Sequence, residues 1–254
     1  MIYLNRNVTL NQLKEVVQKN INHKMDYMSD DFNSEQKNAL ELFQKRIFLE
    51  EIIDETISFN KKIFWNNSNE HLNLTTTAEE LISVYKLRSD VYKDINYQRE
   101  FPDEIEGLNF DIFDKKSAIL YYKINNEVTG SIRMIVDSKN RLPTDKYHSF
   151  DKHRETQNLC ELSRLVIKQK NKGLKMEFKH LFKAIYEIQS NQNNNIDKLI
   201  LSITKSHYKF YSKFGGINIE EDRKEGYGNL RVPFLILTWN PILISNYFER
   251  LFLK

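Results

Sequence analysis

The spacing of hydrophobic residues divides the chain into a helical first third and an alternating remainder. After Thr9, apolar residues recur at helical spacing at Leu10, Leu13, Val16, Val17 and Ile21. A second stripe predicts a longer helix that begins near Asn33 and Gln36 and ends near Phe64 and Trp65; its members are Leu40, Phe43, Ile47, Ile52, Ile53 and Ile57. Residues 66–69 are polar and mark a boundary. We therefore expect a helical N-terminal extension over residues 1–69 and a second domain over residues 70–254.

Strands and helices alternate in this second domain. Thr77 and Glu80 have the spacing of a capping box, which predicts a helix that carries Leu81, Val84, Tyr85 and Arg88. Strands are predicted over residues 118–124, 128–136, 159–167, 199–203 and 230–238. Helices are predicted after Gly173, over residues 206–214 up to Gly215, and from Pro241 through Leu251. This order predicts a mixed α/β (α+β) fold.

Composition narrows the class of protein. The 254 residues, 40% of them hydrophobic, suit one large domain or one domain with an extension. One cysteine excludes an internal disulfide framework and favours a reducing compartment. The first ten residues lack the features of a signal peptide, and no run approaches the ~18 apolar residues of a membrane span. We therefore expect a cytoplasmic protein without a transmembrane segment.

Charge and histidine spacing make two further kinds of site improbable. A net charge of +3 gives no indication of a nucleic-acid partner. The six histidines show no metal-ligand spacing, so we expect no metal site. Lys175, Lys179 and Lys183 recur every fourth residue, which is typical of a solvated helix face or of a docking face for an acidic partner.

Charged residues interrupt an apolar segment at residues 160–167. In a regular strand Glu161 and Ser163 face one side and Arg164 faces the other. Buried charges require partners, ligands or hydrogen bonds. Residues of both signs stand elsewhere in the chain, so we expect a partly buried network that joins Arg88, Arg133 and Arg164 to Asp111, Asp114 and Glu161. The alternative is a simple buried ion pair between Glu161 and Arg164.

In this order, these residues resemble the acyl-homoserine lactone synthases (autoinducer synthases) and the related long-chain N-acyl amino acid synthases, two groups of acyltransferases with the GNAT fold. The positions that match are Arg88, Tyr92, Asp111, Asp114, Arg133, Glu161, Ser163 and Arg164. Residues 207–216 resemble the GNAT segment in which a short helix carries an aromatic pair, here with Tyr211, and ends in Phe-Gly. The resemblance covers residues 81–238 and implies a GNAT-like mixed central sheet flanked by helices.

Two departures from the pattern bear on substrates. Asn109 stands where the lactone synthases have a glutamate, and their acidic cluster helps to hold the cationic S-adenosylmethionine. The resemblance therefore favours the N-acyl amino acid synthases. The pyrophosphate loop of GNAT enzymes has only one glycine and irregular spacing here, over Gln169, Lys172, Gly173 and Lys175. This loop favours an acyl carrier protein as donor and partner over coenzyme A.

The resemblance also implies roles for individual residues. Glu161 is the expected general base, and Tyr211 is expected to protonate the departing thiolate. Backbone N–H groups near residues 165–167 are expected to hold the oxyanion. The acceptor would contact Arg88, Tyr92, Asp111, Asp114, Arg133, Ser163 and Arg164. The donor or its phosphates would contact Val166, Ile167, Gln169, Lys172, Gly173 and Lys175.

The leading hypothesis is the transfer of a long acyl chain from acyl carrier protein to a small-molecule amine such as an amino acid, with no tightly bound cofactor. Acyl-CoA is the other donor considered. Three alternatives stay open at this point: a lactone synthase that uses S-adenosylmethionine, an acetyl-CoA-dependent N-acetyltransferase, and a non-catalytic protein that binds acyl ligands. Packing is the competing explanation for Tyr211 and for Cys160.

Overall fold

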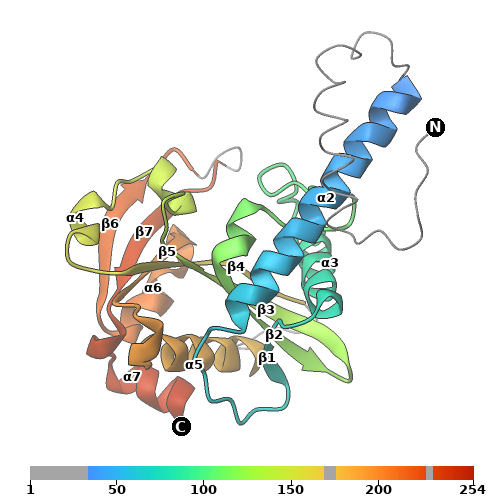
Figure 1. The fold of residues 1–254 in the computed structure, drawn as a ribbon. Helices are drawn as coiled ribbons and strands as arrows, with labels where there is room; N and C mark the ends of the chain where they lie inside the picture. Colours follow the sequence, from blue (N-terminus) through green and yellow to red (C-terminus); the bar gives the residue numbers. More distant parts are fainter. Residues whose placement is uncertain (1–33, 169–175, 227–230) are drawn as a thin grey trace. The chain divides into compact units, whose positions relative to one another are not determined.

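The computed structural model describes residues 34–168, 176–226 and 231–254, and the chain divides into two compact units between Glu51 and Ile52 (Figure 1). The first described element is helix α2 (Ser34–Asn60), which belongs to the first unit up to Glu51 and to the second from Ile52. In the first unit, Glu41 pairs with Lys45 and Arg46 with Glu50, each one turn apart. The helix predicted over residues 10–21 lies outside the described residues. The domain boundary at residues 69 and 70 stays a prediction.

Helix α2 ends at Asn60, several residues before the predicted end. The Asn60 side chain accepts a hydrogen bond from the amide of Ile119 (3.1 Å) and donates one to the hydroxyl of Thr75 (2.9 Å). The chain then continues without helix to the first strand, and the indole N–H of Trp65 donates to Glu187. Side-chain partners at the helix end therefore stop α2 before its hydrophobic pattern ends.

A seven-stranded mixed sheet forms the centre of the second unit, in the order β1-β2-β3-β4-β5-β7-β6. Its strands are β1 (Leu72–Leu74), β2 (Ser117–Ile124), β3 (Glu127–Val136), β4 (Leu159–Ile167), β5 (Lys198–Thr204), β6 (Ile217–Arg223) and β7 (Phe234–Trp239). Neighbouring strands are antiparallel except for β4 and β5. The predicted strands are confirmed, the last in shortened form. The edge strands β1 and β6 were not predicted, because β1 is short and β6 is rich in charge.

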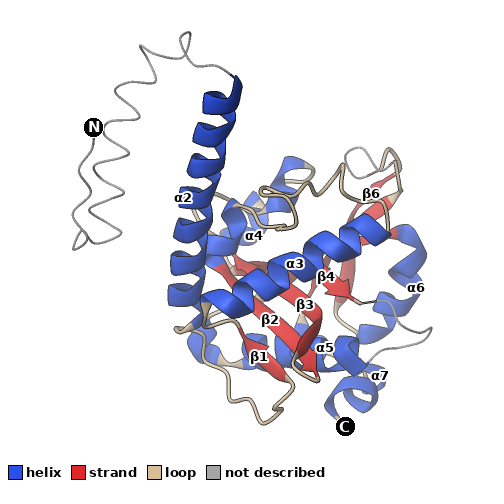
Figure 2. Ribbon diagram, turned by 90° about the vertical axis from the view of Figure 1, so that its right-hand side faces the viewer, coloured by secondary structure: helices blue, strands red, loops and turns tan. Residues whose placement is uncertain are grey.

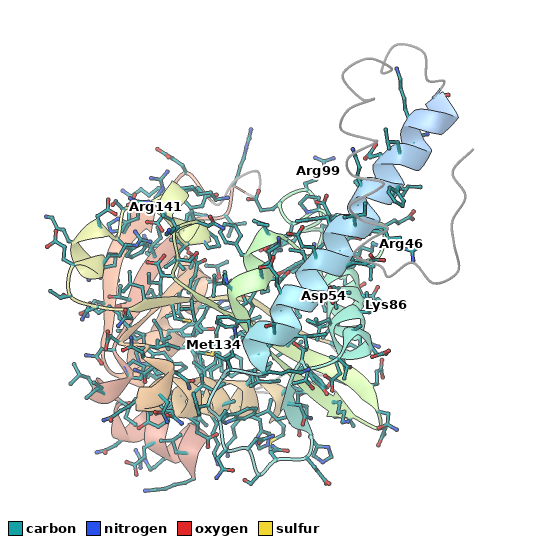
Figure 3. The ribbon with its side chains drawn as sticks, in the orientation of Figure 1. Arg46, Asp54, Lys86, Arg99, Met134 and Arg141 are labelled. Carbon is teal, nitrogen blue, oxygen red and sulfur yellow. The ribbon has the colours of Figure 1, made fainter. Side chains whose placement is uncertain are left out.

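Helices cover both faces of the sheet. Helix α3 (Ala78–Asp94) begins at the predicted capping box of Thr77 and Glu80 and crosses one face (Figure 2). On the other face lies α5 (Met176–Ser190), packed so closely that a Cβ atom at Gly130 would stand 3.0 Å from the Glu177 side chain. Met134 is buried in the core on the α5 side, whereas Lys86 and Arg141 point outward (Figure 3). The predicted GNAT-like arrangement of a mixed sheet with flanking helices is confirmed.

An aromatic cluster closes the core on the α5 side. Phe182 of α5 packs with Phe214, which follows α6 (Tyr208–Tyr211), with Trp239 at the end of β7 and with Phe252. Phe248 packs with the last three of these rings. Gly216 has a φ of +68°, and a Cβ atom there would stand 2.3 Å from the Asn240 carbonyl oxygen. The predicted continuous helix from Pro241 to Leu251 is wrong. A 3₁₀ turn (Pro241–Leu243), the short helix α7 (Asn246–Phe248) and a π-helical turn (Glu249–Leu253) replace it.

Candidate active site

Strands β4 and β5, the parallel pair of the described sheet, separate after only a few residues and leave an opening between them. Strands β4 and β5 are in register from Leu159 and Lys198 to Leu162 and Leu201, and not beyond. Two cavities, of about 290 and 430 Å³, adjoin at this point and share the lining residues Ser163, Arg164, Ser202, Ile203, Thr204, Leu162, Tyr92, Tyr97 and Phe101. The predicted site residues of β4 therefore lie at an opening into the sheet.

A β-bulge in β4 changes the direction of its side chains. Arg133 is opposite Ser163 and Ser131 is opposite Val166, so Arg164 and Leu165 have no registered partner on β3. Arg164 has a φ of +52°, in the left-handed region that costs a non-glycine residue on the order of 1 kcal/mol or more. The expected strict alternation is wrong beyond Ser163, because the bulge shifts the period by one residue. Ser163 and Arg164 consequently reach the same polar cluster.

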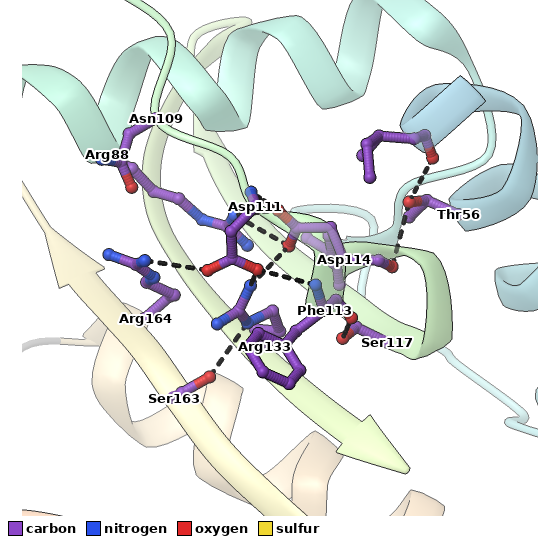
Figure 4. Close-up of polar contacts among 12 residues, drawn as sticks. Thr56, Arg88, Asn109, Asp111, Phe113, Asp114, Ser117, Arg133, Ser163 and Arg164 are labelled. Atoms are coloured by element: carbon purple, nitrogen blue, oxygen red, sulfur yellow. Dashed lines mark hydrogen bonds and ion pairs between the residues drawn. The ribbon is translucent and has the colours of Figure 1, made fainter. Parts of the chain in front are cut away.

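Three arginines and two aspartates form this cluster (Figure 4). Arg133 Nη1 donates to Asp111 Oδ1 at 2.6 Å and to Asp114 Oδ1 at 3.1 Å. Arg88 Nη1 donates to both carboxylate oxygens of Asp114, at 3.0 and 3.2 Å. Arg164 Nη2 donates to Asp111 Oδ2 at 2.9 Å. Ser163 holds the far side of Arg133 by accepting from its Nε at 2.9 Å. The structure thus brings together residues from α3, β3, β4 and the loop before β2.

A 3₁₀ turn, η1 (Ile112–Lys116), orients the two aspartates. Asp111 accepts from the Phe113 amide, and the Asp111 amide donates to Asp114, in a reciprocal capping arrangement. Burial by itself raises the pKa of Asp111, but the charges and hydrogen bonds of Arg133 and Arg164 lower it well below its usual range. Asp111 is therefore held in its ionised form, and both carboxylates already accept from arginine donors.

Positive charge is in excess in the cluster. Three guanidinium groups face two carboxylates, and all three arginines are largely buried. Within the part of the chain that the structure describes, Arg164 Nη1 and the Nε and Nη2 atoms of Arg88 are buried without a hydrogen-bond partner. Arg164, which also lies 4.4 Å from the Phe101 ring centre, lines both cavities. The cluster can therefore bind an additional anion.

Glu161 lies apart from these ion pairs and lines the smaller cavity. Its residue is 3% exposed, and its Oε2 accepts from the backbone amide of Thr144 at 2.9 Å. Burial raises the pKa of Glu161 to about 7, although Thr144 and the charge of Arg133 oppose the shift. Arg164 pairs with Asp111 and not with Glu161, so the expectation of a simple pair between these two residues of β4 is wrong. A carboxyl group with this pKa can both accept and release a proton near neutral pH.

The other predicted site residues lie around the larger cavity or outside the described residues. Tyr92 and Tyr211 both line this cavity, and burial raises the pKa of Tyr211. Val166 packs with Leu87 of α3, and both Val166 and Ile167 are paired with β3. Gln169, Lys172, Gly173 and Lys175 lie outside the described residues.

Two residues of the site make contacts that the sequence does not predict. Thr144 donates its backbone amide to Glu161, which any residue except proline could do, and its side chain adds a second hydrogen bond. Asn109 is buried and its Nδ2 donates to the carbonyl oxygens of Phe101 and Pro102, at 2.9 and 3.0 Å. It therefore holds the loop that places the Phe101 ring over Arg164. An acid at position 109 would instead face two carbonyl oxygens.

Two kinds of feature are absent from the described residues. Over residues 34–168, 176–226 and 231–254, no three His, Cys, Asp or Glu side chains come together in a way that could hold a metal ion. In the same ranges, no helix combines the length and the apolar character needed to cross a membrane.

Comparison with known proteins connects this site to an enzyme family. A family model described as N-acyl amino acid synthase FeeM matches residues 83–239. No curated protein sequence matches the chain. Among solved structures, FeeM, an N-acyl amino acid synthase from uncultured soil microbes, has a TM-score of 0.54 at 17% identity, over 72% of this chain and 93% of that chain.

Two further solved structures share the fold. The AHL synthase LasI has a TM-score of 0.50 at 15% identity, over 72% of this chain and 95% of that chain. The CoA-dependent acyl-homoserine lactone synthase BjaI, in complex with MTA, has a TM-score of 0.51 at 14% identity, over 68% and 80% of the two chains. At these identities, the similarity establishes the shared architecture.

Proposed function

The chain belongs to the N-acyl amino acid synthase FeeM family and is an acyltransferase, and we propose from this premise that it joins an acyl group from a thioester to the amine of a small acceptor that carries a carboxylate, such as an amino acid. The excess of positive charge at the site carries the choice of acceptor. Two carboxylates are engaged by three guanidinium groups, and Arg164 retains a buried donor beside the cavities. A carboxylate on the acceptor would supply the missing negative charge.

The charge distribution also disfavours a cationic acceptor. S-adenosylmethionine carries a sulfonium, and the two aspartates that could attract it already accept hydrogen bonds from Arg88, Arg133 and Arg164. Asn109, which replaces the acid expected in lactone synthases, donates its amide to two backbone carbonyls. Both observations support the prediction of an amino acid acceptor over a lactone synthase reaction.

Glu161 is the proposed base for the proton that the acceptor must lose. An amino acid binds as an ammonium, and only the neutral amine can attack a thioester. In the proposed reaction, the Glu161 carboxylate takes one proton from the ammonium, directly or through water. The amine nitrogen then forms a bond to the thioester carbonyl carbon. Because the pKa of Glu161 is about 7, a large fraction of the enzyme holds this base ionised at neutral pH.

The bulge in β4 and Tyr211 would complete the reaction. Arg164 and Leu165 lack registered partners on β3, so their amides are candidate donors to the oxyanion of the tetrahedral intermediate. When the carbon–sulfur bond breaks, the thiolate needs a proton. Tyr211 lines the adjoining cavity, and burial keeps its hydroxyl protonated, so it can supply that proton. The products would be an N-acyl amino acid and the free thiol of the donor.

The larger cavity suits the acyl chain. Its apolar lining comes from both sides of the opening between β4 and β5 and includes Ile132, Leu165, Phe178, Phe182, Leu201, Ile203 and Phe210. A chain in this cavity would place its thioester next to the bulge of β4. The preference for an acyl carrier protein over coenzyme A rests on the sequence of residues 169–175 and stays a prediction.

An assay of donors against acceptors tests this function. Purified protein is incubated with a long-chain acyl carrier protein or the matching acyl-CoA, together with S-adenosylmethionine or a panel of free amino acids. Mass spectrometry then identifies the products. We expect N-acyl amino acids, with the carrier protein as the better donor. Lactone with release of methylthioadenosine, and no acylated amino acid, would overturn the proposal. Normal binding of acyl donor without turnover on any acceptor would indicate a non-catalytic protein.

A further inference from the structure

The connection between β3 and β4, residues 137–158, reaches the site through a single turn. Its 3₁₀ segment η2 (Pro143–Lys146) places the Thr144 amide 2.9 Å from Glu161 Oε2 and the Thr144 hydroxyl 3.2 Å from Ser202 Oγ. Because the contact to Glu161 is made by backbone, it depends on the conformation of the whole connection. Whatever holds the connection in place therefore also controls the environment of Glu161.

One guanidinium group holds this connection at two points. Arg154, in the short helix α4 (Asp151–Arg154), donates through Nε to Asp137 at the end of β3. Its Nη1 donates to Asp145 Oδ1 at 2.7 Å. Asp145, the residue after Thr144, in turn accepts from the Leu142 amide at 2.8 Å. The fork of one arginine thus joins the strand end to the turn that carries Thr144.

The clamp is partly shielded from water. The Arg154 side chain is 20% exposed and those of Asp137 and Asp145 are 14% and 8% exposed. Arg141, on the same connection, is 53% exposed; it pairs with the exposed Asp151 at 2.8 Å and reaches Asp145 only at 3.7 Å. Partly buried, charge-assisted pairs contribute more than exposed ones. The ion pairs of Arg154 should therefore stabilise this connection more than those of Arg141.

We propose that Arg154 is a positioning residue for the acyl transfer: through Asp145 it keeps the Thr144 amide on the Glu161 carboxylate. The proposal rests on the proposed function of Glu161 as the base. The charged and polar groups that share its cavity or act on its charge are Arg133 of β3, Asp145 and Lys146 of the connection, Arg164 of its own strand, Asp111, Glu100 and the uncharged Ser202 of β5. Thr144 supplies neutral donors, its backbone amide and its side chain, and such donors favour the ionised carboxylate.

The clamp therefore acts on the ionisation of Glu161. Without Arg154, the turn would be released and Glu161 would lose a hydrogen bond to its charged form. Its pKa would rise, and a higher pH would be needed to produce the base. We expect Arg154→Gln to move the acidic inflection of the kcat profile upward by about one pH unit, which lowers kcat about tenfold below that inflection. At high pH the variant should approach wild-type kcat, and its KM for the acceptor should change less than twofold.

The experiment combines the kinetic profile with direct observation of Glu161. Protein labelled with ¹³C at the glutamate carboxyl carbons is titrated by NMR, and Glu161→Gln identifies the signal of Glu161. Arg154→Gln should shift this titration upward, Arg154→Lys should shift it partly, and the matched control Lys152→Gln, at an exposed position of the same helix, should leave it unchanged. If Arg154→Gln fails to fold, Asp137→Asn removes one arm of the clamp and should cause a smaller upward shift.

The outcomes separate this inference from the proposed function. An unchanged NMR titration in the folded Arg154 or Asp137 variant overturns the clamp. A uniform loss of kcat at every pH, with no movement of the titration, also overturns it, because that result indicates a purely structural role. A shifted titration that kcat does not follow supports the clamp and shows instead that Glu161 is not the base.

Discussion

At the scale of single residues, the candidate base differs from its charged neighbours in what surrounds it. Arginines contact both aspartates of the cluster and lower the pKa of Asp111, whereas Glu161 accepts from the backbone amide of Thr144. Burial then dominates its ionisation and raises its pKa to about 7. The same strand thus carries Arg164, which is fixed in its charged state, and Glu161, which can change its state.

We expect Glu161→Gln to lower kcat at least a hundredfold while the protein stays folded. General-base catalysis typically contributes about 10²–10⁴-fold, and glutamine can still accept from the Thr144 amide. In the wild type, kcat should rise as the pH increases through about 7, because only the ionised form is active. Circular dichroism and kcat measured from pH 5.5 to 9 check this prediction.

The same substitution should also change how the stability of the protein depends on pH. The pKa of Glu161 is raised on folding, so the wild-type protein loses stability as the pH rises from about 4.5 to about 7. Glu161→Gln should remove that loss. The matched control is Glu100→Gln, which alters another carboxylate of the same cavity and should keep the inflection near 7. Turnover of Glu161→Gln within twofold of wild type would exclude Glu161 as the base.

Asp114→Asn should be strongly destabilising. Asp114 is completely buried and accepts from Arg88, Arg133 and the Asp111 amide, so the substitution leaves two guanidinium groups with too little negative charge. Removing one partner of a buried pair costs about 3–5 kcal/mol. Asp90→Asn, on the exposed face of α3, should change stability by less than about 0.5 kcal/mol. Urea unfolding of the three proteins measures the difference, and equal midpoints would contradict the prediction.

The sequence predicts the residue types of the site better than their partners. Arg88, Asp111, Asp114, Arg133, Ser163 and Arg164 come together as the order of charges indicates. The pairing of Arg164 with Asp111 depends on a bulge that resets the alternation of β4, which no periodicity shows. Thr144 reaches Glu161 from a different element, through its backbone amide and its side chain, and no motif in the sequence marks this contact.

At the scale of elements, the end of α2 supports the loop that carries the aspartates. The Thr56 hydroxyl is 3.0 Å from the carbonyl oxygen of Asp114, and Asn60 provides a side-chain partner for the Ile119 amide of β2. Residues 52–60 precede the region that the family model matches. Their contacts nevertheless stabilise the turn that orients Asp111 and Asp114.

Asn60→Ala should therefore reduce the stability of the protein, although Asn60 precedes all the residues that line the two cavities. The substitution leaves the buried Ile119 amide and the Thr75 hydroxyl without their partner, at a cost of about 1–3 kcal/mol for each unsatisfied group. Lys61→Ala, at the exposed next position, is the control and should be near neutral. Thermal unfolding of the full chain checks this, and identical Tm values would show that Asn60 has no supporting role.

Elements were predictable where hydrophobic periodicity and terminal signals agree. The capping box of Thr77 and Glu80 gives the start of α3 correctly, and β4 is predicted with its observed ends. The pattern fails where tertiary partners decide the structure. Asn60 ends α2 early because it bonds to β2, and the residues after Pro241 pack as short turns around the aromatic cluster.

At the scale of the whole molecule, an acyl carrier protein would have to dock on the surface of this protein near the larger cavity, so that its acyl chain could enter that cavity. Phe178 and Phe182 of α5 line the larger cavity, and Lys179 and Lys183 lie on the same helical turns. Lys175, the third lysine of the predicted docking face, lies outside the described residues. An acidic carrier that contacts these lysines would stand close to the acyl cavity.

Reversing both lysines in Lys179→Glu/Lys183→Glu should weaken use of acyl carrier protein. We expect kcat/KM for the acyl carrier protein to fall about tenfold at low salt. The difference in kcat/KM between variant and wild type should become smaller toward ~0.5 M salt, because salt screens the charges. Lys61→Glu/Lys62→Glu, two exposed lysines after α2, should have little effect. Steady-state kinetics at several salt concentrations checks this. An unchanged KM for acyl carrier at low salt would exclude this docking face.

The short register between β4 and β5 has a consequence for partial unfolding of the sheet. Among the described strands, the register between β4 and β5 joins the four-stranded part, β1 to β4, to the three-stranded part, β5, β7 and β6, through four residue pairs. Such a seam is a weak point at which two cooperative units can separate before either unfolds. Native-state hydrogen exchange should therefore show the amides of residues 159–162 and 198–201 exchanging through a shared subglobal opening, at lower free energy than the centre of β2 and β3. An acyl donor bound between the strands would slow exchange on both sides of the seam together.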